Sequence, residues 1–401
     1  MLLPFNGLAS QVLGEQSWLR PVFGASKDLL LAVLIVRAIV RGRPAAKFLL
    51  AVLLCWVSTA VAGFYSPGLG VALFGFRNDY WGLALLVVVP ALCDARTRLF
   101  LARLVVVMSE VAAGVAIVTH RLGLSWLDRI GGLGADGAYH FTFFTQGSSV
   151  PRAFSPYVSP NELAAAMAVI ICLLTWPAIA GTRWRLVLAI APFAALLLAR
   201  SRSGVLDLIA GLSVVAFLRY ALPWLRKLDP GRRGLAIFVG LALLPAVALV
   251  ASLMVGHYSQ EPSAVGHAAS LQDSLRLFAS HPFGFGLGEV GPRASAVTDT
   301  ALLTESSILL IGLEVGWLGL TYYCVLIGMV GFVLWRGATS PAAGADPRRA
   351  AVGLAILVAT LPSQLVLPTI QDIPVAWLWW ILLGLTLPVG TEGDGTGLRS
   401  S

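Results

Sequence analysis

Long apolar runs alternate with short polar segments along most of the chain. A helix needs about 20 apolar residues to cross the hydrocarbon core of a bilayer, and most of these runs reach or approach that length. Because they are continuous and do not alternate residue by residue, they exclude a transmembrane β-barrel. We predict spans near residues 26–42, 46–63, 80–95, 99–119, 160–181, 184–199, 204–222, 234–256, 304–335, 350–368 and 373–390.

The expected fold class is therefore all-α. We expect a polytopic membrane helix bundle of about 11–12 spans, forming a single integral membrane domain over residues 1–401. The composition agrees, because 58% of the residues are hydrophobic and only 12% are charged, which excludes a soluble domain of this length. The run at 304–335 is too long for one perpendicular span, and Gly312, Gly316 and Gly319 could break or tilt it.

Two long polar stretches, at residues 120–159 and 257–303, interrupt the apolar pattern. The second opens with an amphipathic helical pattern near 270–278. It then reaches a glycine-rich turn, in which His281-Pro282 is followed by glycines at 284, 286, 288 and 291. Lys and Arg concentrate in the alternate loops that exclude these two stretches, so the positive-inside rule places both long loops on the outer face of the membrane.

Several other function classes lack support in the sequence. The four cysteines are scattered through apolar runs, which favours buried thiols over a disulfide framework or a zinc site. Neither a Walker nor a Rossmann pattern occurs. We therefore expect no cofactor and no metal. The net charge of +8 indicates topology and contact with membrane lipids rather than a nucleic-acid partner.

Five arginines on the outer side exceed what topology requires. An arginine near hydrocarbon costs about 2.5–3.5 kcal/mol on insertion scales, so it is usually retained where it binds an anion. Guanidinium groups grip phosphate oxygens bidentately, and several together could stabilise a leaving lipid diphosphate without a metal. Glu305 could then remove a proton from an acceptor hydroxyl. These candidate site residues are Arg152, Arg200, Arg202, Arg276, Arg293 and Glu305.

Each candidate also has a purely structural interpretation. An arginine near a helix end can extend to the lipid headgroups, and a carboxylate can stabilise the positive end of a helix. The alternatives are Arg200 or Arg202 reaching headgroups or paired with Asp207, Arg152 as a loop anchor, Arg276 on a solvated helix face, and Glu305 as a helix cap.

Three stretches occur in an order that points to one family. The first is Arg152-Ala153-Phe154-Ser155 followed by Ser159-Pro160-Asn161, and the second is Ser201-Arg202-Ser203-Gly204. The third is His281-Pro282-x-Gly284-x-Gly286-x-Gly288, followed by Glu305-Ser306-Ser307 and Gly316-Trp317-Leu318-Gly319. With these motifs the chain resembles the superfamily of O-antigen ligases and Wzy-type polysaccharide polymerases over roughly residues 25–390.

The resemblance implies a GT-C-like membrane glycosyltransferase that uses undecaprenyl-diphosphate-linked glycan on the extracytoplasmic face of the bacterial inner membrane. It implies that Arg152, Arg202 and Arg276 hold the donor diphosphate, with Arg200 and Arg293 as further candidates. Arg202, Arg276 and Glu305 would be the catalytic residues. Where the ligases place a histidine-asparagine pair, this chain has Glu305-Ser306, which favours a polymerase.

Partners expected from the resemblance are the lipid-linked oligosaccharide, membrane lipids, a chain-length regulator and a flippase. Two alternatives stay open at this point. One is a ligase that transfers glycan to lipid A-core or protein. The other is a transporter or flippase for lipid-linked glycan, which predicts ionisable groups on broken helices inside the bundle.

Overall fold

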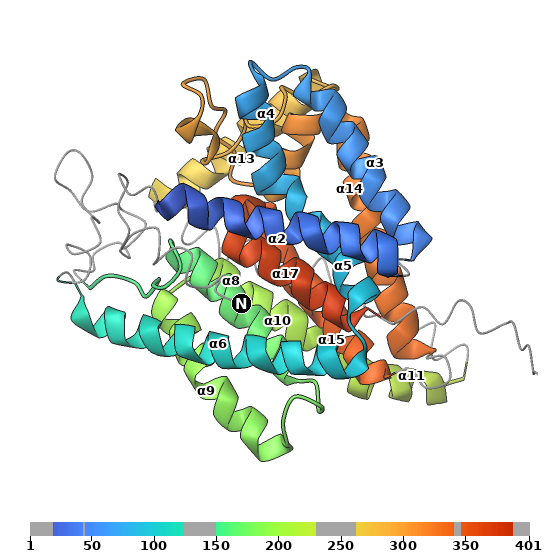
Figure 1. Cartoon of the computed structure of the whole chain (residues 1–401). Coiled ribbons are helices and arrows are strands. Elements are labelled where there is room, and N and C mark those ends of the chain that lie inside the picture. The colour runs from blue at the N-terminus through green and yellow to red at the C-terminus, as the bar shows by residue number, and fades with distance from the viewer. Residues whose placement is uncertain are drawn as a thin grey trace, which may run out of the picture.

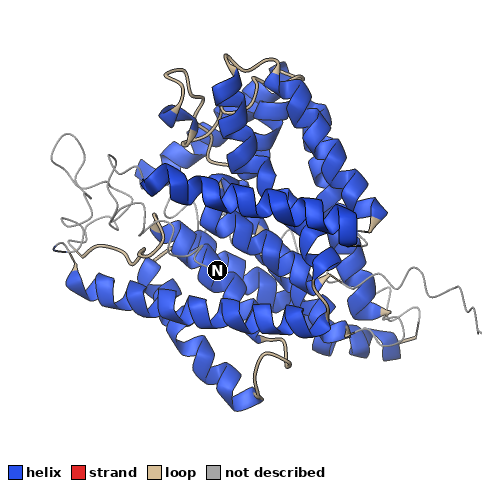
Figure 2. Ribbon diagram, in the orientation of Figure 1, coloured by secondary structure: helices blue, strands red, loops and turns tan. Residues whose placement is uncertain are grey.

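Helices form all the regular secondary structure in the residues that the computed structural model describes, namely 19–42, 45–123, 125, 150–229, 262–340 and 346–387 (Figures 1 and 2). The span predicted at 234–256 and most of the loop predicted at 120–159 lie outside these residues. The helices are α2 (Leu19–Arg41), α3 (Ala46–Gly63), α4 (Leu69–Gly75), α5 (Leu85–Leu92), α6 (Ala95–Leu122), α8 (Pro160–Leu174), α9 (Thr182–Ala199), α10 (Arg202–Ala216), α11 (Leu222–Lys227), α13 (Pro262–Ser280), α14 (Ser307–Thr339), α15 (Pro347–Ala359), α16 (Leu361–Val366) and α17 (Ile373–Thr386).

Seven helical segments of the described chain are long and apolar enough to cross a membrane. This confirms the all-α polytopic helix bundle as the fold class. The segments are Ala46–Gly63, Leu69–Leu92, Ala95–Leu122, Thr182–Ala199, Arg202–Lys227, Ser307–Thr339 and Pro347–Val366. The segment Leu69–Leu92 begins earlier than the span predicted at 80–95, and it includes a π-helical turn, η2 (Phe76–Tyr80).

Two of the predicted spans are shorter than expected. Helix α8 has 15 residues and α17 has 14, where the sequence predicted spans at 160–181 and 373–390. Pro177 ends α8 early, because the residue before a proline avoids the helical region, although the apolar run continues beyond it. Both helices are buried within the bundle, so their apolar surface meets protein rather than lipid.

Helix α8 lies in the middle of the bundle, packed against α9, α10, α15, α6 and α17 (Figure 1). Backbone groups at a buried helix end need partners within the protein. At the start of α8, the Ser159 side chain accepts a hydrogen bond of 3.2 Å from the N–H of Glu162, and Pro160 has no N–H to satisfy. This confirms the helix start that the sequence predicts at Ser159-Pro160.

Helix α14 breaks at Gly316, whose φ of 70° and ψ of −172° are not helical. The glycine-rich turn of the predicted outer loop packs against this break. The N–H of Trp317 donates to the carbonyl of Pro282 at 2.9 Å, and the N–H of Gly286 donates to the carbonyl of Glu314 at 3.2 Å. The predicted break in α14 and the predicted glycine-rich turn therefore contact each other directly.

Two carboxyl groups are buried inside the bundle beside helix irregularities. Glu314, in the turn before Gly316, accepts hydrogen bonds from the Gly288 N–H at 2.8 Å and from the Tyr80 hydroxyl at 3.1 Å. Asp79 lies in the π-helical turn η2 and accepts a bond of 3.4 Å from the Gln371 amide. Glu314 therefore fastens the glycine-rich turn to the core.

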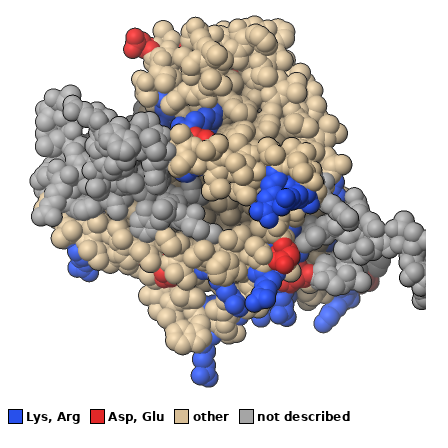
Figure 3. Space-filling view, viewed as in Figure 1, with Lys and Arg blue, Asp and Glu red and all other residues tan. Residues whose placement is uncertain are grey.

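Charged side chains are unevenly placed on the face shown in Figure 3. Most of that face is uncharged, and Lys and Arg gather mainly in the lower and right parts of the view. The helix ends at Arg41, at Arg226 and Lys227, and at Arg336 carry basic residues in their last turns.

We predict that Gly316→Ala destabilises the protein by about 1–3 kcal/mol, the usual cost of a side chain in a sparsely populated backbone conformation. A Cβ at Gly316 would also lie 2.3 Å from the Pro282 carbonyl oxygen. Gly328→Ala is the matched control, since a Cβ there meets nothing within 4 Å. Thermal unfolding in detergent is the measurement, and equal midpoints for the two variants would contradict this account of the break.

Candidate functional site

Arg152 joins the segment before α8 to the end of α9. Its Nε donates to the Ala199 carbonyl at 2.7 Å, and its Nη2 donates to the Asn161 side-chain oxygen at 3.0 Å. A cation at the carboxyl end of a helix is favourable, because the last carbonyls carry partial negative charge. The structural interpretation of Arg152 as an anchor is therefore confirmed, and the contact fixes where its charge lies.

A tight two-residue connection, Arg200-Ser201, links α9 to α10. Arg200 adopts a left-handed conformation with φ of 48°, which is uncommon for a residue with a side chain. Ser201 is the N-cap of α10 and donates a hydrogen bond of 2.9 Å to the same Asn161 oxygen that Arg152 contacts. Asn161 thus ties both segments to the first turn of α8.

Arg152, Arg200 and Arg202 gather around this turn, and we call them the arginine cluster. Burial lowers the pKa of Arg152 to about 10, and the charges of Arg200 and Arg202 contribute to the decrease. Arg152 still carries its proton at neutral pH, so like charges repel one another here. A bound anion would relieve that repulsion. The structure thus brings together three of the five arginines that the sequence selected.

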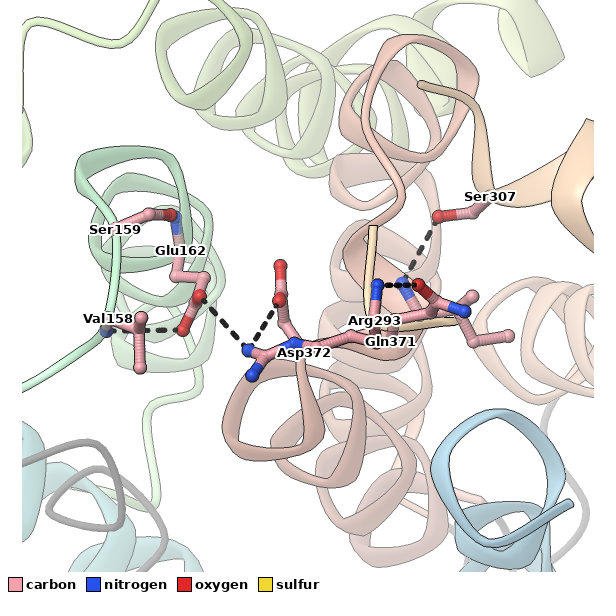
Figure 4. Close-up of polar contacts among 8 residues, drawn as sticks. Val158, Ser159, Glu162, Arg293, Ser307, Gln371 and Asp372 are labelled. Atoms are coloured by element: carbon pink, nitrogen blue, oxygen red, sulfur yellow. Dashed lines mark hydrogen bonds and ion pairs between the residues drawn. The ribbon is translucent and has the colours of Figure 1, made fainter. Parts of the chain in front are cut away.

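Arg293 lies between two carboxylates, and we call Glu162, Arg293 and Asp372 the acidic triad (Figure 4). The Arg293 Nη2 lies 3.2 Å from Asp372 Oδ1 and 3.9 Å from Glu162 Oε1. Burial alone would lower the pKa of Arg293, but Asp372 and Glu162 raise it. Arg293 was predicted as a further diphosphate ligand, yet its charge is already balanced by these carboxylates.

Backbone and amide contacts hold the triad in place. The Gln371 side-chain oxygen accepts from the Arg293 N–H at 3.2 Å, and its amide donates to the Val290 carbonyl at 2.9 Å. The Ser307 hydroxyl accepts from the Ile370 N–H at 3.1 Å. The loop before α14 and the segment before α17 are therefore fastened together beside Arg293 (Figure 4).

Arg276 and Glu305 differ from each other in exposure. Arg276 is exposed on α13, where it forms an ion pair of 3.5 Å with Asp273, as the solvated-face alternative predicts. Glu305 is half-buried. The N-cap of α14 is Ser306, whose side chain accepts from the Leu309 N–H. Glu305 directly precedes this cap, and its interpretation as a charge that stabilises the positive end of the helix stays a prediction.

Asp207, the predicted partner of Arg200 or Arg202, is hydrogen-bonded to Ser363. The Asp207 carboxylate is buried and accepts hydrogen bonds from the backbone N–H and the hydroxyl of Ser363 on α16. Asp207 thus serves the contact between α10 and α16.

Sequence reasoning missed Asn161, Glu162 and Asp372 as site residues. Glu162 stands three residues after Ser159, which is the spacing of a capping box, but its carboxylate accepts from the Val158 N–H at 3.5 Å and faces Arg293. Asp372 precedes a proline by two residues, a common pattern for a helix start. In each case a local signal offered a sufficient explanation, so nothing in the sequence indicated the distant partner.

Comparisons with known proteins add no assignment. No family model matches this chain, and no curated protein matches it.

We predict that Arg293→Ala destabilises the protein by about 1–3 kcal/mol, because it removes the cation that pairs with Asp372 and faces the buried Glu162. The effect should stay below the roughly 3–5 kcal/mol of a fully buried pair, since the Arg293 side chain is 41% exposed. Arg276→Ala is the control, with a side chain 71% exposed and an expected change within about 0.5 kcal/mol. Thermal unfolding in detergent compares them, and an unchanged midpoint for Arg293→Ala would contradict the prediction.

Proposed function

We propose that this chain is a polysaccharide polymerase of the membrane glycosyltransferase class. It would transfer glycan from undecaprenyl diphosphate to a sugar hydroxyl of another lipid-linked repeat unit. The observation that carries the proposal is the arginine cluster around Asn161, at the joined ends of α8, α9 and α10. Arg200 and Arg202 lie near enough to Arg152 for their charges to lower its pKa, and guanidinium groups grouped in a largely apolar protein are suited to a diphosphate.

The proposed reaction is a single displacement. The acceptor oxygen forms a bond to the anomeric carbon of the donor glycan, and the bond from that carbon to the phosphate oxygen breaks. The electron pair leaves with the lipid diphosphate, whose negative charge the arginine cluster stabilises. The acceptor proton passes to a carboxylate, for which Glu305 is the candidate base predicted from the sequence.

We place the reaction on the extracytoplasmic face of the bacterial inner membrane. The concentration of Lys and Arg toward one part of the surface in Figure 3 supports this orientation. A flippase that delivers the lipid-linked unit and a chain-length regulator are the partners that this reaction implies.

A second candidate, a transporter of lipid-linked glycan, is favoured by a different observation. Asp79 and Glu314 are buried inside the bundle, one in a π-helical turn and the other beside the break at Gly316. Ionisable groups on interrupted helices are typical of transport sites. However, Glu314 uses its carboxylate to hold Gly288 and Tyr80, which is a sufficient structural role.

We predict that Arg202→Ala lowers the rate of glycan transfer about 10²–10³-fold, the usual loss when a donor that stabilises a leaving group is removed. The assay uses purified protein in detergent with undecaprenyl-diphosphate-linked repeat units extracted from cells that make this protein, in EDTA and without nucleotide. A ladder of products on a gel reports polymerisation. Arg183→Ala is the matched control, because Arg183 is exposed near the opposite end of α9 and should leave the ladder intact.

Other results would redirect the assignment. Transfer of one glycan to added lipid A-core, without a ladder, would indicate a ligase. A failure of the wild-type protein to transfer glycan, together with movement of the lipid-linked unit across vesicles that depends on Glu314, would indicate the transporter. Loss of transfer in Glu305→Gln with intact donor binding would support Glu305 as the base.

A further inference from the structure

Asp372 occupies a helix-capping position without capping the helix. It is the N-cap residue of α17, where an aspartate side chain commonly accepts a bond from the first turn, yet its side chain makes no such bond. Its backbone carbonyl accepts from the N–H groups of Val375 and Ala376 at 2.8 and 2.9 Å instead, and Pro374 has no N–H. The carboxylate is directed at Arg293 (Figure 4), so the helix does not account for it.

Exposure within the acidic triad increases in one direction. The Glu162 side chain is 3% exposed, that of Asp372 is 20% exposed and that of Arg293 is 41% exposed. Glu162 therefore balances the guanidinium from the inside, while Asp372 and Arg293 both reach the surface. An ionised carboxylate has about four acceptor positions and a guanidinium has five donors. Arg293 and Asp372 share one hydrogen bond, and both also interact with Glu162. These contacts use only part of their donor and acceptor positions, so the pair keeps capacity for a polar ligand.

The chemistry of the pair selects the kind of ligand. The only guanidinium of the triad is already paired with Asp372 and Glu162, which leaves the triad no cation for a second diphosphate. Sugar hydroxyls both donate and accept hydrogen bonds, so they match a carboxylate beside a guanidinium. The Gln371 contacts to Arg293 and Val290 hold the pair before any ligand arrives, which lowers the entropic cost of binding.

The location of the pair fits the second substrate of a transfer reaction. Asn161 anchors the arginine cluster, and its neighbour Glu162 anchors the acidic triad. Both groups of residues thus share the first turn of α8. A donor whose diphosphate lies on the arginines and a sugar held on the triad would therefore both be bound beside this turn.

We propose that Asp372 and Arg293 form the acceptor-sugar subsite, with Glu162 positioning Arg293. The ligand is the terminal sugar of the acceptor glycan, held through its hydroxyl groups. This inference rests on the proposed function, because it assigns the acceptor side of the same reaction. Asp372 and Arg293 contact the acceptor, and Glu162 acts only through Arg293.

The test separates acceptor binding from donor binding. The acceptor probe is the repeat-unit oligosaccharide released by mild acid from the cell's lipid-linked pool, and the donor probe is undecaprenyl diphosphate. Asp372→Asn keeps the shape of the side chain and removes its charge. We expect it to weaken oligosaccharide binding about tenfold or more, since a hydrogen bond to a charged group contributes about 1.5–3 kcal/mol, with no change in the affinity for undecaprenyl diphosphate. Arg202→Ala should show the opposite pattern.

Asp299→Asn is the matched control, because Asp299 is an exposed carboxylate of the loop that carries Arg293. This substitution should change neither affinity. In the transfer assay, Asp372→Asn should raise the KM for the acceptor and leave kcat nearly unchanged. Equal oligosaccharide affinity of the wild-type protein and Asp372→Asn would overturn the subsite, as would a parallel loss of both ligands. Absence of transfer by the wild-type protein would overturn the proposed function instead, while the binding comparison would still decide the subsite.

Discussion

The amino end of α8 is the constraint on which the candidate site depends. This helix is buried on all sides, so its first N–H groups have to be satisfied inside an apolar bundle. Two residues reduce the number of N–H groups without a partner. The Ser159 hydroxyl accepts a hydrogen bond from the Glu162 N–H, and Pro160 has no N–H. The side chains of Asn161 and Glu162 are then available to distant segments. The Asn161 side-chain oxygen accepts hydrogen bonds from Arg152 and Ser201, and Glu162 faces Arg293.

The arginine cluster and the acidic triad are therefore tied to the same helical turn. Each would be costly alone, since charge in an apolar bundle loses its hydration. In the acidic triad, Arg293 is paired with Asp372 and Glu162. In the arginine cluster, burial lowers the pKa of Arg152, and the charges of Arg200 and Arg202 lower it further. The two groups therefore differ in the charges around the central cation, which are carboxylates at Arg293 and other arginines at Arg152.

Local patterns in the sequence were sufficient to predict the fold class, but they did not predict the contacts of the acidic triad. Apolar run length predicted most of the helices, and Ser159-Pro160 predicted the start of α8. Three glycines were named as possible breaks in the long run at 304–335, and the structure breaks at one of them, Gly316. The lengths of α8 and α17 were wrong, because an apolar run does not reveal whether protein or lipid covers it. Nothing in the sequence distinguishes Asp372 from an ordinary N-cap. Only the approach of Arg293, from the loop before α14, shows that its side chain faces elsewhere.

The loop that carries Arg293 is held at two points by carboxylates of different kinds. Near the start of the loop, the Gly288 N–H donates a hydrogen bond to the buried Glu314. Further along, Arg293 pairs with Asp372 and Glu162. Glu314 would be expensive in the core without that backbone donor, so the interior requires the loop to lie where it does. The same geometry places Arg293 beside α8. A structural need inside the bundle thus fixes the position of a charged group at the surface, which is why a loop can contribute to a site that demands rigid placement.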